Sequence, residues 1–294
     1  MRIGYYPGCT LKTTAKIFED TALVSTKALG IELVEPPNWN CCGTVYSLAS
    51  EDVIHYLAPI RNLIRFQEMG ISEVVTLCSI CYNTMYRANH LFRENKDKRD
   101  IMLSIMDREE AYRGEIELYH LLSYLRDKVG FDRIKEKVVL PLENLKAGAY
   151  YGCLLLRPAG VEIDDPESPK IMENLLESLG ATPVYFPLQI ECCGSFETVN
   201  NPELVRGRIK DIVDNARLFG ARLIVVSCPL CHFNLDKRQE ELAKADSSFV
   251  PIPVLYFTEL MQIALTGELP DFSSHYIDPG VVISEVTGES GAKV

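Results

Sequence analysis

The sequence predicts an α/β protein made of two similar open parallel sheets that arose by internal duplication. Short β-rich runs alternate with helical segments along the chain, an order typical of βαβ units with right-handed crossovers. The ten cysteines also fall five to each half, in the same order. We therefore expect two pseudo-symmetric, Rossmann-like domains at 1–130 and 149–267, a connector at 131–148 and a C-terminal arm at 268–294.

The first half alternates strands and helices from its first residues. Apolar residues recurring every three or four positions predict the helices, and Gly30 and Gly70 follow two of them as stops. The charged stretch 93–114 is interpreted as a solvated helical excursion. Runs rich in β-branched and aromatic residues predict the strands. The expected strands are 2–8, 31–34, 73–77 and 116–119, and the expected helices are 13–29, 51–69, 81–92 and 121–129.

The second half repeats this plan. The run 149–153 matches 5–9, and Gly180 ends a helix as Gly30 does. The offset between the halves grows from 144 residues at the first cysteine to 150 at the last, as loop-length changes in a duplicated unit would give. The expected strands are 149–153, 183–186, 222–228 and 254–257, and the expected helices are 169–179, 202–219 and 259–265.

Composition narrows the class of protein. The chain has 294 residues, of which 47% are hydrophobic and 24% charged, as expected of a soluble globular protein. No apolar run has the length of a membrane span, and the N-terminus enters a strand without a signal peptide, so we expect a cytoplasmic protein. The net charge of −11 argues against nucleic-acid binding but leaves room for a local basic pocket.

The cysteines follow one repeated pattern. Each half has a Gly-Cys pair, then a Cys-Cys-Gly triplet, then a Cys-x2-Cys pair. Thiols stay reduced in a reducing compartment, so this pattern favours metal or redox chemistry over disulfides. Because the carboxyl ends of parallel strands meet at one edge of a sheet, each set is expected to gather there. The first set is Cys9, Cys41, Cys42, Cys78 and Cys81, and the second is Cys153, Cys192, Cys193, Cys228 and Cys231.

Five thiolates in a set exceed the need of common metal sites. A structural zinc ion takes four ligands, and so does an ordinary iron–sulfur cubane. Adjacent thiolates can reach two irons or bridge them, so a larger or irregular iron–sulfur cluster fits better, with zinc as the open alternative. Gly43 and Gly194 are expected to let the backbone pass close to such a cluster; Gly8 and Gly152 would do the same or form a tight turn.

The spacing carries a family resemblance. It is Cys-x31-Cys-Cys-x35-Cys-x2-Cys in the first half and Cys-x38-Cys-Cys-x34-Cys-x2-Cys in the second. This pattern resembles the motif of the cysteine-rich CCG domain family, so the two expected domains would be CCG domains. The spacer between Cys193 and Cys228 is slightly short for that motif, which we interpret as a trimmed loop. Two copies from Cys9 to about Tyr256 resemble the B subunits of heterodisulfide reductases.

The resemblance implies cofactors, a substrate and partners. The cofactors would be two noncubane [4Fe-4S] clusters, one held by each set of five cysteines. The substrate would be the mixed disulfide of coenzyme M and coenzyme B, reduced to two thiols with one electron from each cluster. The partners would be a small subunit with two cubane [4Fe-4S] clusters, a flavin-containing bifurcating subunit, and hydrogenase or formate dehydrogenase modules.

Two other functions stay open at this stage. Related domains also occur in electron-transfer subunits of organic-acid dehydrogenases and quinone-linked reductases, where the clusters would not touch a substrate. A zinc-stabilised interaction module is the third interpretation. The chain shows no dinucleotide fingerprint and no Walker A loop, so we expect no flavin or nucleotide site in it.

An anionic substrate needs basic groups near the clusters. Lys12 and Arg157 occupy matching positions after the first cysteine of each half, and His232 follows Cys231, so these three are the candidate substrate contacts. Arg87 and Lys237 are weaker candidates. The tyrosine pairs 5–6 and 150–151 are expected to pack within strands, and Trp39 to shield a cluster or pack its loop.

Overall fold

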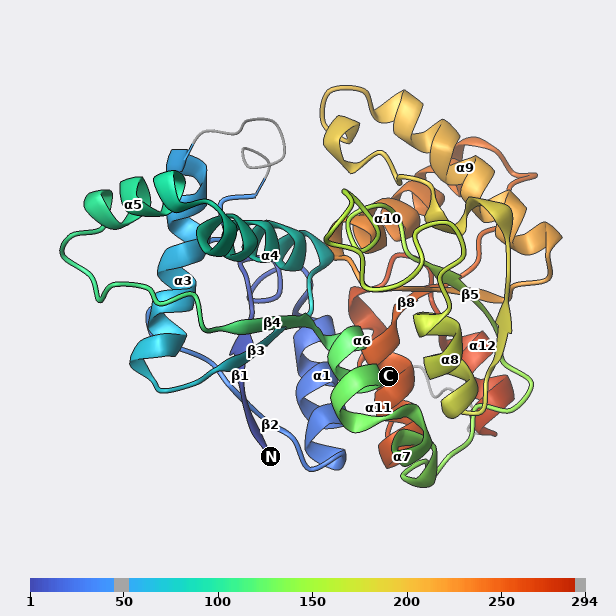
Figure 1. Cartoon of the computed structure of the whole chain (residues 1–294). Coiled ribbons are helices and arrows are strands. Elements are labelled where there is room, and N and C mark those ends of the chain that lie inside the picture. Colours follow the sequence, from blue (N-terminus) through green and yellow to red (C-terminus); the bar gives the residue numbers. More distant parts are fainter. Residues whose placement is uncertain (45–52, 289–294) are drawn as a thin grey trace.

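The computed structural model of the chain describes residues 1–44 and 53–288. These residues form two four-stranded sheets in which every neighbouring pair of strands is parallel (Figure 1). The strand orders are β2-β1-β3-β4 and β6-β5-β7-β8, so each strand of the first sheet has its counterpart four strands later. The predicted class, a duplicated α/β unit with open parallel sheets, is confirmed.

The first half builds its sheet around two buried strands. The central strands β1 and β3 are almost wholly buried, as is usual where helices cover both faces of a parallel sheet. Its strands are β1 (Arg2–Tyr6), β2 (Glu32–Val34), β3 (Glu73–Thr76) and β4 (Glu117–His120). Its helical segments are α1 (Lys16–Ala28), η1 (Val53–Tyr56), α3 (Leu57–Glu68), α4 (Ser79–Glu94), α5 (Lys96–Ile105), α6 (Leu121–Tyr124) and the π-helical turn η2 (Leu125–Val129).

The second half repeats this arrangement, with α7 in the connector and η5 and α12 in the arm. Its strands are β5 (Lys146–Tyr150), β6 (Thr182–Val184), β7 (Leu223–Val226) and β8 (Val254–Tyr256). Its helical segments are α7 (Phe131–Glu136), α8 (Ile171–Ser178), η3 (Pro187–Ile190), η4 (Ser195–Glu197), α9 (Pro202–Leu218), α10 (Pro229–Ala245), α11 (Phe257–Thr266), η5 (Phe272–Ser274) and α12 (Gly280–Thr287).

Several boundaries differ from the sequence-based expectations. Residues 51–52 of the expected helix 51–69 lie outside the described residues, and the α-helix itself begins at Leu57 after a 3-10 turn. The helix expected to open at Cys81 begins at Ser79, because Cys78 in extended conformation is its N-cap. In the arm, α12 buries only Ile283, which explains why its sequence carries so little helical periodicity.

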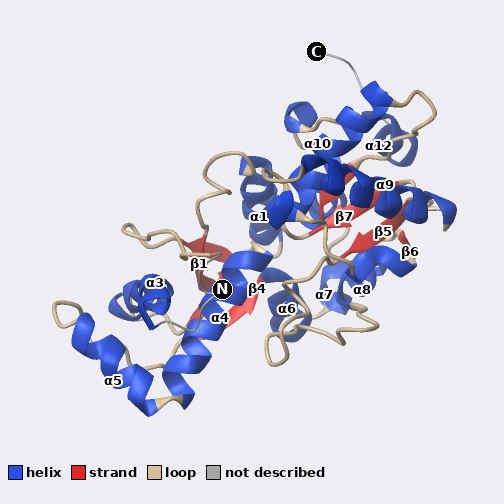
Figure 2. Ribbon diagram, turned by 90° about the horizontal axis from the view of Figure 1, so that it is seen from above, coloured by secondary structure: helices blue, strands red, loops and turns tan. Residues whose placement is uncertain are grey.

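Helices between the two sheets join the halves. Figures 1 and 2 show α1 and α6 between the sheets, and α1 packs along α11. The Thr21 and Thr258 hydroxyls lie 2.7 Å apart, and Ser25 donates to the Thr258 carbonyl at 3.1 Å. Phe18 stacks on Tyr256 with 4.1 Å between ring centroids. This contact fixes the edges of the two sheets relative to each other.

Candidate metal centres

The first set of cysteines converges at the carboxyl end of β3. Cys78 is the N-cap of α4 and Cys81 lies in its first turn. The Cys42 and Cys81 sulfurs are 3.6 Å apart. Cys41 and Cys42 share a further thiol hydrogen bond, whereas Cys9 stays exposed beside them. The first turn of α4 and the Cys-Cys loop therefore hold four of the five thiols together.

The second set is arranged in the same way around α10. Cys228 is the N-cap of that helix. Thiol hydrogen bonds link Cys153 to Cys192, Cys192 to Cys193, Cys193 to Cys231, and Cys231 to Cys228. All except Cys192 line one small cavity. As in the first set, each thiol is free of disulfide bonding.

The two sets meet at the centre of the molecule. Cys78 and Cys228 share a thiol hydrogen bond, and both are buried. Beside them, the Ser79 and Ser227 hydroxyls are 3.1 Å apart, and Ser79 also donates to the Ser227 carbonyl at 3.2 Å. The expectation that each set gathers at its own sheet edge is met, and the structure adds that the two edges face each other.

Shared hydrogen bonds favour thiolates in both sets. Bonds from the Cys41 and Cys81 thiols hold the pKa of Cys42 well below its ordinary value. Bonds from Cys228 and Cys81 do the same for Cys78, and bonds from Cys153 and Cys193 lower the pKa of Cys192 to about 2. Thiolates are the species that bind metal, and soft iron and iron–sulfur clusters prefer them.

Glycines leave the space that the thiols occupy. A Cβ on Gly8 would come within 2.8 Å of the Cys81 sulfur, and one on Gly152 within 3.0 Å of the Cys231 sulfur. These two glycines therefore provide the close approach that the sequence suggested. Gly43 and Gly194 have a different reason: their φ angles are +74° and +78°, and an added Cβ would meet no sulfur atom within 4 Å.

Two buried tyrosines anchor the Cys-Cys loops. The Tyr6 hydroxyl donates to the carbonyl of Asn40 at 2.8 Å, and Tyr150 donates to the carbonyl of Glu191 at 2.6 Å. Each acceptor immediately precedes a Cys-Cys pair. The sequence predicted strand packing for these residues but not the anchor, although the repeated Tyr-Tyr-x-Gly-Cys motif is its signal. Trp39 packs edge-on against Tyr6, with 5.9 Å between ring centroids.

The second set has polar contacts that sequence reasoning missed. Arg208 donates to the Cys192 carbonyl at 2.9 Å. Asn234 donates to the Cys193 carbonyl at 3.2 Å and lies 3.7 Å from its sulfur. At an offset of 150 residues, the first half has Ala58 and Thr84 instead. The two sites therefore differ in their surroundings, and no motif signalled this difference.

The predicted substrate contacts are placed unevenly. Lys12 is held by Glu19 at 2.7 Å and Glu35 at 2.6 Å. The side chain of Arg157 is 54% exposed, with Glu167 at 3.4 Å. These two basic groups lie at the surface, and their contact with a substrate stays a prediction.

His232 is buried in the second half. It stacks on Tyr256 with 4.3 Å between ring centroids, and its Nε2 lies 3.1 Å from the Val254 carbonyl. Burial lowers the pKa of His232 to about 3. The ring is therefore neutral at pH 7, and its predicted role as a substrate contact needs a route that the burial restricts.

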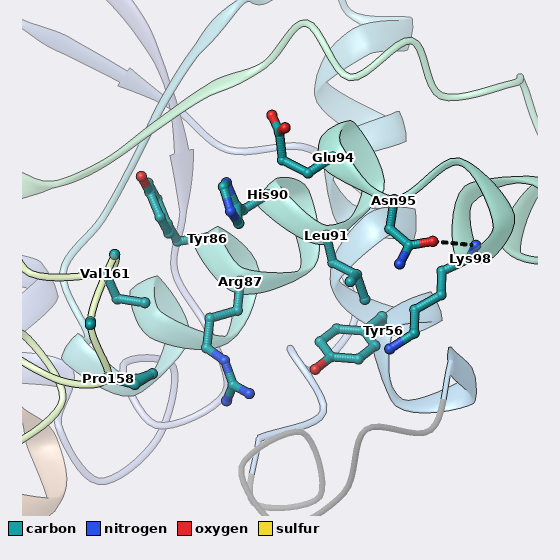
Figure 3. Close-up of a pocket in the computed structure, with 12 residues that line it drawn as sticks. Tyr56, Tyr86, Arg87, His90, Leu91, Glu94, Asn95, Lys98, Pro158 and Val161 are labelled. Atoms are coloured by element: carbon teal, nitrogen blue, oxygen red, sulfur yellow. Dashed lines mark hydrogen bonds between the residues drawn. The ribbon is translucent and has the colours of Figure 1, made fainter.

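A basic pocket lies between the two halves. Its volume is about 410 Å³, and it separates α4 from the segment 158–161 that follows Cys153 (Figure 3). Arg87, His90 and Lys98 line it together with Glu94. Arg87 was a weaker candidate from the sequence, whereas Lys98 carried no signal beyond its charge.

Comparison with known proteins agrees with this geometry. The family described as the cysteine-rich domain, CCG, matches residues 3–86 and 147–236. The chain belongs to the cysteine-rich CCG domain family. The matched segments contain all ten cysteines, so both halves are CCG domains. Clustered cysteines in two CCG repeats indicate an iron–sulfur protein, an oxidoreductase subunit whose substrate the family alone does not specify.

Two curated relatives belong to different complexes. The chain is 31% identical to the 8-methylmenaquinol:fumarate reductase membrane anchor subunit of Wolinella succinogenes, over 89% of this chain and 91% of that protein. It is 30% identical to a protein of Archaeoglobus profundus that is named as similar to the B chain of heterodisulfide reductase, over 90% of this chain and 91% of that protein. Both names refer to reductase complexes. Within the described residues, no helix has the length and apolar character needed to cross a bilayer.

A solved structure shares the fold. A hypothetical protein from Helicobacter pylori superposes with a TM-score of 0.73 at 12% identity. The match covers 94% of this chain and 51% of that chain, so the present chain spans about half of its length. At this identity the likeness concerns the fold alone.

Proposed function

We propose that this chain is the disulfide-reducing subunit of an iron–sulfur oxidoreductase complex, with the coenzyme M–coenzyme B mixed disulfide as its substrate. The contact between the two complete cysteine sets at Cys78 and Cys228 carries this proposal. Each set of five would hold one noncubane [4Fe-4S] cluster. When bound, the two clusters would supply one electron each, which matches the two electrons that reduce a disulfide.

The chain's own residues would prepare these centres. Cys78 and Cys228 sit at helix N-termini, where the helix dipole favours a thiolate. Both are buried, so the protein excludes water from the region between the sets. Cys9 and Cys41 are exposed, which leaves an approach to the first set from solvent.

The basic pocket supports an anionic substrate. Arg87 follows Cys81 by six residues on α4, or about 9 Å along the helix axis. A ligand whose sulfur reaches the first set could therefore place an acidic group beside Arg87 and Lys98. We propose this pocket, with Arg157 and Lys12 as outer contacts, as the recognition surface for the acidic arms.

A second candidate function has its own support. The similarity to a subunit of a quinol:fumarate reductase favours a chain that passes electrons between partners without touching a disulfide. In both candidates the chain would work within a complex. For the disulfide-reducing function we propose a small subunit with two cubane clusters and a flavin-containing bifurcating subunit as partners, with hydrogenase or formate dehydrogenase modules as electron sources.

The decisive experiment combines metal analysis with turnover. The chain would be reconstituted anaerobically with iron and sulfide, and oxidation of reduced viologen would be followed with and without the mixed disulfide. We expect two [4Fe-4S] clusters per chain and disulfide-dependent oxidation. Two intact clusters without this activity would favour the electron-transfer function, and a single cluster would overturn the assignment of both cysteine sets.

Matched serine variants test the ligand assignment. Cys41→Ser should remove only the cluster of the first half, and Cys193→Ser only that of the second, because each thiol contacts members of its own set. Iron content and electron paramagnetic resonance of each variant would report the loss. Survival of both clusters in either variant would show that the ligands are assigned wrongly.

A further inference from the structure

Apart from the ten cysteines, the second half contains a buried group of three metal-binding side chains. His232 and Asp236 are four residues apart on α10 and share one face of that helix. His275 belongs to the C-terminal arm, directly after η5. One nitrogen or oxygen atom from each of the three lies within 4.8 Å of the others. Two separate segments of the chain therefore present nitrogen and oxygen donors to one point.

Hydrogen bonds set the tautomer of both imidazoles. Nε2 of His275 lies 2.9 Å from the Glu259 carboxylate, and Nε2 of His232 lies 3.1 Å from the Val254 carbonyl. A carbonyl oxygen only accepts, so Nε2 of His232 carries the proton; the Glu259 carboxylate selects the same tautomer in His275. Each ring then keeps its lone pair on Nδ1. Metal-binding histidines typically donate their other N–H to a carboxylate or a carbonyl in this way.

One of these lone pairs lacks a partner. The side chain of His275 is fully buried, and its Nδ1 has no hydrogen-bond partner among the described residues. Buried polar atoms of this kind are rare in folded proteins, because an unmade hydrogen bond is costly. A metal ion bound to Nδ1 would satisfy the atom.

The charge around the group also calls for a cation. Glu259 and Asp236 are both buried, and among the described residues neither forms an ion pair with a lysine or arginine. Asp236 accepts hydrogen bonds from the backbone N–H groups of Tyr276 and Ile277, at 2.8 and 2.9 Å. Buried carboxylates need a charged partner or a metal ion. A divalent cation would balance both charges.

The group has room for access and for a water ligand. A cavity of about 190 Å³ is lined by His232 and Asp236 and, from the arm, by Ser274 and Tyr276. Zinc sites with three protein ligands use histidine and carboxylate donors and keep a fourth position for water. The donor set and the cavity match such a site.

We propose that His232, Asp236 and His275 bind one divalent transition-metal ion, best matched by zinc, which fastens the C-terminal arm to α10. The site contains no thiolate, so it differs in chemistry from the cysteine sets, although His232 follows Cys231. It is independent of the reaction that the clusters carry out.

Cobalt is a suitable probe for this site. The full chain, with its cysteine sets filled by reconstitution, would be titrated with Co²⁺ and then with Zn²⁺. We expect one equivalent of Co²⁺ with weak visible ligand-field bands of nitrogen and oxygen ligation, without sulfur charge-transfer absorption, and displacement by Zn²⁺. Absence of this spectrum in the wild-type chain would overturn the proposal, whatever the variants do.

Conservative variants locate the ion. His275→Gln and Asp236→Asn should lose the cobalt spectrum while iron content stays unchanged. His90→Gln, which alters an exposed histidine on α4, is the matched control and should keep the spectrum. A spectrum that persists in His275→Gln would place the ion elsewhere and refute the site.

Proteolysis of the wild-type chain adds a test that needs no variant. If zinc fastens the arm, zinc at ten times its dissociation constant should slow cleavage in the arm about tenfold, because binding suppresses the open state by that factor. Equal cleavage rates with and without zinc would contradict the fastening role.

Discussion

Replacing Gly8 by alanine tests how closely the backbone must approach the first cysteine set. The new Cβ would lie 2.8 Å from the Cys81 sulfur, whereas ordinary contacts begin at 3.4 Å. The sulfur would have to move by about 0.6 Å, and metal–ligand distances tolerate only about 0.2 Å. Gly8 also has φ of +74°, so alanine adds about 1–2 kcal/mol of backbone strain.

Gly70→Ala is the matched control for this prediction. Gly70 has φ of +68°, and an added Cβ there would meet nothing within 4 Å. Both variants should lose about 1–2 kcal/mol of unfolding free energy from strain. Only Gly8→Ala should also lose the first cluster, measured as iron and sulfide content and by electron paramagnetic resonance. If Gly8→Ala kept both clusters with unchanged spectra, the inference that glycine makes room for Cys81 would be wrong.

Three further predictions concern the second set, pH and the basic pocket. Tyr150→Phe removes the hydrogen bond to the Glu191 carbonyl and should lower the unfolding free energy by about 1 kcal/mol in urea titrations; an unchanged midpoint would argue against the anchor. Burial lowers the pKa of His120 from 6.5 to about 4, so the unfolded chain binds the proton more tightly, and stability should fall by about 2 kcal/mol from pH 7 to pH 5. His120→Gln should flatten that dependence, and an equal slope in the variant would exclude His120 as its source. Arg87→Gln should raise the KM for the mixed disulfide several-fold at unchanged cluster content, and an unchanged KM would remove the pocket from substrate recognition.

Local sequence signals were sufficient for the secondary structure and the repeat. Apolar periodicity located α1, α8 and α9 within a few residues, because each helix buries one continuous face. It did not reveal α12, which buries a single residue. The early start of α4 at Ser79 was also missed, since a cysteine N-cap carries no common sequence signature.

The candidate sites were predictable only in part. The cysteine positions could be read from their spacing, and the approach of Gly8 to a thiol from its place beside Cys9. The anchoring by Tyr150 and the contact of Arg208 with the Cys192 carbonyl could not, because both depend on the path of a loop after its strand. Residues in such loops meet partners far away in the chain, which local patterns do not encode.

The sequence by itself determined that this protein has two α/β units, each carrying five cysteines at the end of its strands. Periodicity and spacing are local properties, and duplication makes them visible twice. Only the tertiary structure decided that Cys78 meets Cys228 and that His275 reaches His232. The first contact depends on the packing of α1 against α11 and the second on where the arm docks. Both are set by complementary surfaces that form after the local elements exist.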